Sequence, residues 1–121
     1  MFKFIEITLH LNVKNEEKGE RVLARFRELF ERPMSIQSFG RNPDDDSMFR
    51  VDLITPLETD NIEHAIFETL KACTTFATSW TVFGPDKYED GRWEFSGLAR
   101  DGQVTIPGIR AAGFEITSYE E

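Results

Sequence analysis

Residues 4–13, which read FIEITLHLNV, decide how the rest of the chain is interpreted. Apolar and polar side chains alternate along this segment over ten residues. A period of two is typical of a β-strand that buries one face and leaves the other free. The buried positions are then Ile5, Ile7, Leu9, Leu11 and Val13, and the other face carries Glu6, Thr8, His10 and Asn12.

Helical and extended patterns alternate after this strand. Asn15 is a good cap for a helix over about residues 16–31, which Pro33 ends. A second helix is expected over about residues 60–74, with Thr59 or Asp60 as its cap. Strands are expected at about 34–40, 48–55, 76–83, 92–99 and 113–119, with acidic turns at 40–47 and 84–91.

This order predicts an α+β fold in one domain, residues 1–121. The first six elements, β-α-β-β-α-β, match the ferredoxin-like pattern, and a C-terminal pair of strands follows. Two helices would then cover one face of a largely antiparallel sheet, and the other face would be solvated or used for binding. A sheet of five or six strands in another order is the alternative, because patterning does not fix strand order.

Acidic residues are concentrated in the middle of the chain. The net charge is −8, and residues 42–68 carry eight acidic groups against Arg50 alone. Direct binding of nucleic acid is therefore not expected, since phosphate contacts need a basic patch. An acidic surface favours basic partners, although it can also serve solubility alone. No apolar run is long enough to span a membrane, and no signal peptide is visible, so a cytoplasmic protein is expected.

Catalytic, cofactor and metal motifs are missing from the sequence. Glycine-rich phosphate loops, nucleophile elbows and paired metal-ligand spacings do not occur. The single cysteine, Cys73, falls on the apolar stripe of the second helix, where a thiol is usually a small buried hydrophobe. His10 is expected to be an ordinary sheet histidine. Trp80, Trp93, Phe83 and Phe95 could form a stacking platform, but acidic flanks favour core packing. We therefore expect neither an enzyme nor a cofactor.

The C-terminal third contains a distinctive series of packing residues and turns. The strand Trp93-Glu94-Phe95-Ser96-Gly97-Leu98-Ala99 is followed by Asp101-Gly102 and then by Val104-Thr105-Ile106-Pro107-Gly108-Ile109-Arg110-Ala111-Ala112-Gly113-Phe114-Glu115-Ile116. This stretch of about 24 residues, 93–116, resembles the ending of small bacterial immunity proteins. These proteins are cytoplasmic antidotes to polymorphic and contact-dependent growth inhibition toxins.

The resemblance implies an inhibitor that binds a cognate toxin, which for many such systems is a nuclease with a basic cleft. The acidic stretch 42–63 and the turn at 86–94 are the expected contact surface, with Tyr88 as an aromatic anchor. Two alternatives remain open: a small-ligand-binding or enzymatic ferredoxin-like domain, and an acidic mimic of nucleic acid. The candidate partner-binding residues are Asp44, Asp45, Asp46, Asp60, Glu63, Asp86, Tyr88, Glu89 and Asp90.

Overall fold

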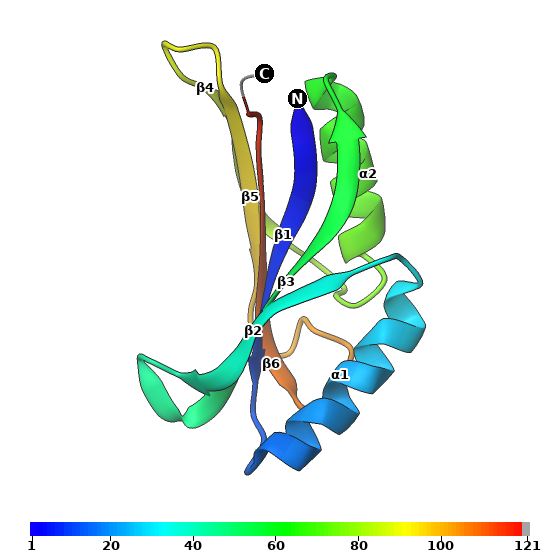
Figure 1. Ribbon diagram of the computed structural model, residues 1–121, viewed down its shortest axis with the longest axis vertical. Coiled ribbons are helices and arrows are strands. Elements are labelled where there is room, and N and C mark those ends of the chain that lie inside the picture. Colours follow the sequence, from blue (N-terminus) through cyan, green and yellow to red (C-terminus); the bar gives the residue numbers. More distant parts are fainter. Residues whose placement is uncertain (120–121) are drawn as a thin grey trace.

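The computed structural model describes residues 1–119. Two helices lie on one side of a long twisted sheet, and the opposite side of the sheet is uncovered (Figure 1). The elements in chain order are β1 (Phe2–Leu11), α1 (Glu16–Phe30), β2 (Ser35–Asn42), β3 (Asp45–Thr59), α2 (Ile62–Cys73), β4 (Thr81–Lys87), β5 (Trp93–Ala99) and β6 (Ile109–Thr117).

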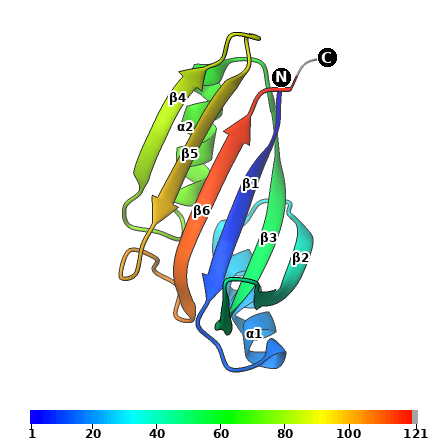
Figure 2. The ribbon, with the colours of Figure 1, turned by 90° about the vertical axis from the view of Figure 1, so that its left-hand side faces the viewer.

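The sheet has six strands in the order β2-β3-β1-β6-β5-β4, and every neighbouring pair is antiparallel (Figure 2). The α+β class and the single helix layer are thus confirmed. The strand order does not confirm the ferredoxin-like topology. In that topology β4 would lie beside β1, but here β6 takes that position. The chain crosses from β3 through α2 to the far edge and returns as the meander β4-β5-β6.

The helices begin where short polar side chains cap them. Asn15 accepts a hydrogen bond from the backbone N–H of Lys18 at 2.9 Å, as expected for the start of α1. The second cap was predicted wrongly as Thr59 or Asp60. It is Asn61, whose Oδ1 accepts from the N–H of His64 at 2.9 Å, because β3 continues through Thr59.

Aromatic rings connect the helices to the sheet. Phe26 of α1 stacks with Phe30 at 5.1 Å between ring centroids and meets Phe76 edge-on at 4.9 Å. Trp80 continues the series to Phe114 of β6, with centroids 5.0 Å apart. These contacts place the core between the helix layer and the sheet, where each aromatic contributes a large buried area.

The predicted strand at 76–83 was wrong in its first half. Phe76 lies in the turn after α2, with its N–H bonded to the carbonyl of Cys73, and only an isolated bridge at Ala77 precedes β4. Both Phe76 and Ala77 are buried, which breaks the alternation of a half-buried strand. The acidic turn predicted at 84–91 is likewise shorter, since β4 runs to Lys87. The tip predicted at 40–47 is also tighter, because β2 extends to Asn42 and β3 starts at Asp45.

Candidate binding surface

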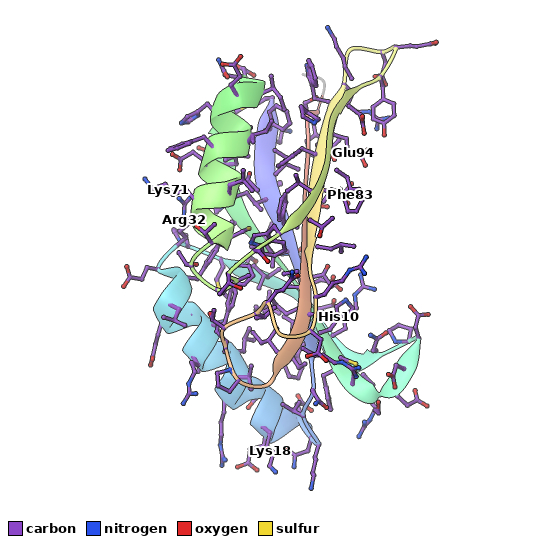
Figure 3. The ribbon with its side chains drawn as sticks, turned by 180° about the vertical axis from the view of Figure 1, so that it is seen from behind. His10, Lys18, Arg32, Lys71, Phe83 and Glu94 are labelled. Carbon is purple, nitrogen blue, oxygen red and sulfur yellow. The ribbon has the colours of Figure 1, made fainter. Side chains whose placement is uncertain are left out.

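The uncovered side of the sheet is here called the open face. It carries the polar side chains that alternate with the buried apolar ones along β1. The cross-strand register places Glu6 opposite Glu115, Thr8 opposite Gly113 and His10 opposite Ala111, so these pairs share this face. Figure 3 shows His10, Phe83 and Glu94 on this side, while Lys18, Arg32 and Lys71 lie on the helix side.

A hollow of about 790 Å³ runs over the centre of the open face. Its floor is low because β6 presents Ala111 and Gly113 where larger side chains would fill the space. One wall is formed by β3 side chains such as Ile54, and the opposite wall by Phe83 of β4 and Leu98 of β5. The volume lies within the range of ligand pockets.

Asp52 of β3 is the centre of a hydrogen-bond network beside the hollow. Its carboxylate accepts bonds from Thr8 Oγ1 at 2.8 Å and from Ser38 Oγ at 2.7 Å. Arg50 Nε donates to both carboxylate oxygens at 3.2 Å. Burial raises the pKa of Asp52, but the hydrogen bonds from Ser38, Thr8 and Arg50 together outweigh it and hold the pKa below its ordinary value. Hydrogen bonds therefore hold the Asp52 carboxylate in place on this wall of the hollow, and Arg50 compensates its charge.

His10 joins the β2–β3 hairpin tip to the sheet. The side-chain amide of Asn42 accepts from the N–H of Asp44 at 2.9 Å through Oδ1, and its nitrogen lies 3.2 Å from His10 Nδ1. Because an amide nitrogen can only donate, Asn42 is the donor and His10 Nδ1 is the acceptor. A ring nitrogen that accepts carries no proton, so the imidazole is neutral. Burial lowers the pKa of His10, as does nearby Arg50, while Asp52 raises it more weakly. A neutral His10 at neutral pH thus anchors the hairpin tip.

Three glutamates, named here the glutamate row, occupy the end of the open face nearest the chain termini. They are Glu6 of β1, Glu115 of β6 and Glu94 of β5. Glu6 and Glu115 are directly opposite each other. Glu115 pairs with Ser96 of β5, and Glu94 precedes Ser96 by two residues, so Glu94 lies diagonally from Glu115 on the same face. Burial raises the pKa of Glu115, and the charges of Glu94 and Glu6 raise it further. Within residues 1–119, no lysine or arginine forms an ion pair with any of the three.

Tyrosine hydroxyls donate hydrogen bonds to two members of the glutamate row. Tyr88 donates to Glu94 at 3.0 Å, and Tyr119 donates to Glu6 at 3.5 Å. The bond to Glu94 raises the pKa of Tyr88. Neutral donors reduce the repulsion among the carboxylates without removing their charge.

Apolar side chains adjoin the glutamate row. Phe83 is 49% exposed and Leu98 is 44% exposed, both on walls of the hollow. The prediction that Phe83 packs in the core with Trp80, Trp93 and Phe95 was wrong for Phe83. It is opposite Ser96 in the register and therefore faces outward, whereas Phe95 is buried and both tryptophans pack against the core. An exposed aromatic beside an aliphatic residue is typical of an interaction surface.

The predicted partner-binding residues fall into three separate groups. Asp44, Asp45 and Asp46 lie at the β2–β3 tip, at the lower end of the molecule in Figure 1. A second group, Asp86, Tyr88, Glu89 and Asp90, lies at the β4–β5 turn, at the upper end. The third group, Asp60 and Glu63, is at the start of α2, on the helix side.

Several of these acidic groups are satisfied locally. Asp45 accepts bonds from the N–H and hydroxyl of Ser47 at 3.0 and 2.6 Å. Asp90 pairs with Arg92 at 3.6 Å, and Asp60 lies 3.6 Å from the amino group of Met1. The structure thus brings none of the three groups together in one site, although both hairpin ends flank the open face.

The glutamate row was missed as a site by sequence reasoning. The alternation at residues 4–13 places Glu6 on the free face, and the same logic applies to Glu115 in the last strand. Their juxtaposition depends on β6 pairing with β1, which the patterning does not reveal.

Residues with metal-binding or nucleophilic chemistry do not gather on this face. Among residues 1–119, no three histidine, cysteine or acidic side chains converge as ligands for one metal ion. Cys73 is buried in the core on α2, and that burial raises the pKa of its thiol. Neither helix in this part of the chain is long and apolar enough to cross a membrane.

Comparisons with family models, with curated proteins and with solved structures found no match to this chain.

Proposed function

We propose that this protein is an immunity protein that binds and neutralises a cognate bacterial toxin domain in the cytoplasm. The observation that carries the proposal is the open face itself. It combines a hollow, exposed apolar side chains and uncompensated carboxylates on one side of the sheet. Interfaces that inhibit tightly have an apolar centre inside a polar rim, and this face offers both.

The resemblance of the C-terminal third to immunity proteins supports the same proposal. The resembling segments form β5 and β6, which build the floor and one wall of the hollow. The net charge of −8 favours a basic partner. A nuclease toxin fits this chemistry because a cleft that holds phosphates must be basic, and the inhibitor would then cover its active or substrate-binding surface.

The acidic hairpin tip has a role in approach under this proposal. Asp44, Asp45 and Asp46 are exposed at one end of the open face, where they can attract a basic surface before contact. Charges at the rim of an interface mainly change the association rate and its salt dependence. The tip therefore steers the toxin, and the sheet face retains it.

A protection assay tests the function directly. The domain encoded by the neighbouring upstream gene is expressed as the toxin, with and without this protein, and cell survival is counted. Survival only with this protein, and not with an unrelated immunity protein, is the expected result. Equal killing in both strains would reject the proposal.

Association kinetics test the steering role. Replacing Asp44, Asp45 and Asp46 with lysine should slow association with the toxin and remove most of its dependence on salt, as stopped-flow fluorescence would show. A matched control replaces Glu20, Glu28 and Glu31, which are exposed on and just after α1. Equal slowing by both triple variants would indicate net charge rather than the hairpin tip.

A small-ligand-binding module is the second candidate, favoured by the hollow. Arg50 and Arg100 line its other end, beside His10, so an anionic small molecule would be the ligand class. Trp80 and Trp93 do not line the hollow and would not stack on such a ligand. A thermal-shift screen with small carboxylates and phosphates distinguishes the candidates: a saturable shift lost on Arg50→Gln supports the ligand, and no shift supports the toxin.

A further inference from the structure

We propose that the partner docks on the end of the open face that carries the glutamate row, placing lysine or arginine side chains among Glu6, Glu94 and Glu115 and apolar groups against Phe83 and Leu98. This inference rests on the proposed function and names the surface and the chemistry of the partner. It moves the binding centre from the acidic turns to the sheet.

Charge complementarity is the first argument. Glu6 and Glu115 are directly opposite in the register, and like charges at such positions destabilise a sheet. Glu94 on the next strand adds a third carboxylate at diagonal spacing. Lys3, on the same strand as Glu6, is directed over the ring of Tyr119 at 5.9 Å and forms no ion pair in the described part of the chain. Cations supplied by a partner would relieve this repulsion.

The shape of the face is the second argument. Gly113 has no side chain, so the floor of the hollow is low at this position. A Cβ added there would lie 3.5 Å from Leu98 Cδ2 and 3.6 Å from a backbone oxygen. Ile54 on one side and Phe83 on the other form the walls of the hollow. A protruding helix or loop enters such a hollow better than a flat surface does. The stems of its lysine or arginine side chains would pack on Phe83 and Leu98 while their charged ends reach the glutamates.

Local pairing in the acidic turns is the third argument. Asp45 is bonded to Ser47, and Asp90 is paired with Arg92. In the glutamate row, tyrosine hydroxyls donate to Glu94 and Glu6, but the carboxylate of Glu115 accepts no hydrogen bond within residues 1–119. An incoming cation would therefore give Glu115 its first partner, whereas Asp45 and Asp90 already have one.

Two variants test the docking surface against the toxin domain encoded by the neighbouring upstream gene. Phe83→Asp should weaken binding by more than about tenfold, mainly through faster dissociation. Phe67→Asp is the matched control, because Phe67 is 62% exposed on α2, on the opposite side of the sheet. It should leave the dissociation constant unchanged. Calorimetry and surface plasmon resonance give both quantities.

Charge reversal separates docking from folding. Glu115→Lys places an opposite charge beside Glu6, so its unfolding midpoint in urea should rise while its affinity for the toxin falls by more than about tenfold. The control is Glu28→Lys on α1, which should leave affinity unchanged. A fall in both stability and affinity for Glu115→Lys would mean that the residue only supports the fold, and it would overturn the proposal.

A peptide titration tests the docking surface without the toxin. A short peptide of alternating lysine and leucine is titrated into the ¹⁵N-labelled protein. Chemical-shift changes centred on β1, β5 and β6 around the glutamate row support the docking surface. Changes centred on the hairpin tip or on the helices overturn it.

The two failures are distinguishable. If the wild-type protein does not bind the toxin domain, the proposed function is wrong, and the peptide titration alone decides the docking surface. If the wild-type protein binds and neither Phe83→Asp nor Glu115→Lys weakens binding, the function stands and the docking surface is wrong.

Discussion

The two faces of the sheet are built from the same strands but obey different rules. On the helix side, Ile7 and Leu9 are almost completely buried, and the aromatic series from Phe26 to Phe114 fills the space above them. On the open face, the alternating positions carry Glu6, Thr8 and His10, with a hollow instead of a packed layer. Successive residues of a strand face opposite sides of the sheet. A residue's position in this alternation therefore indicates its role better than the identity of its sequence neighbours does.

Two glycines on adjacent strands show the same difference. Gly97 of β5 is opposite Phe114, and a Cβ at Gly97 would stand 2.3 Å from a ring carbon of Phe114. Gly113 of β6 would meet nothing closer than 3.5 Å. The first glycine is required by packing, and the second keeps the hollow open.

The largest expected difference between the faces concerns aromatic side chains. Phe26→Ala should lower the free energy of unfolding by about 3–5 kcal/mol, because it leaves a cavity among packed rings. Phe83→Ala on the open face should change it by less than about 0.5 kcal/mol. Urea denaturation followed by circular dichroism measures both, and equal losses would contradict the assignment of Phe83 to the open face.

The glycines provide the second test. Gly97→Ala should cost about 1–3 kcal/mol, since Phe114 is held by Trp80 and Phe95 and cannot move aside freely. Gly113→Ala should be neutral or stabilising by up to about 1 kcal/mol, because alanine restricts the unfolded chain and fits the available space. The same denaturation experiment applies. A larger loss for Gly113→Ala than for Gly97→Ala would reverse the comparison.

The smallest expected effect is electrostatic. Burial, Glu94 and Glu6 raise the pKa of Glu115 above its ordinary value of 4.5, so the folded protein binds this proton more tightly than the unfolded chain does. The resulting stability is complete below pH 4.5 and is lost as the pH rises through the raised pKa. Glu115→Gln should therefore be more stable than the wild type by about 0.2–1 kcal/mol at neutral pH and low salt.

The pH series contains its own control. Below pH 4.5 the advantage of Glu115→Gln should vanish, because the wild-type carboxyl is then protonated as well. Glu28→Gln, which removes one carboxyl from the exposed side of α1, is the matched control for the change in net charge. An advantage that is constant from pH 4 to pH 7, or is absent throughout, would contradict repulsion within the glutamate row.

Most of the element order was predictable from local patterns. The alternation at residues 4–13 gave β1 to within two residues, and Asn15 marked the start of α1 correctly. The strand after α2 was harder to predict, because Phe76, in the turn after α2, and Ala77, in an isolated bridge, are both buried and resemble extended sequence. Burial in a loop carries no periodicity, so patterning misplaces it.

The candidate site was predictable only in part. Acidic residues in the two hairpin ends are visible as charge runs, and the structure places both ends beside the open face. The glutamate row has no such signal in the sequence. Its three members lie far apart along the chain, and each belongs to a different strand. Tyr88 was expected as an anchor for a partner, and it also donates a hydrogen bond to Glu94 of the row.

By itself the sequence determined the α+β class, one helix layer and which side chains of β1 face the core, because these depend on local periodicity and on the free energy of burying apolar surface. Only the tertiary structure decided that β6 and not β4 pairs with β1. That pairing puts Glu115 opposite Glu6 and Gly113 opposite Thr8, which creates both the glutamate row and the hollow. The physical reason is that strand pairing joins distant segments through backbone hydrogen bonds, which are nearly the same for every sequence and leave no local trace.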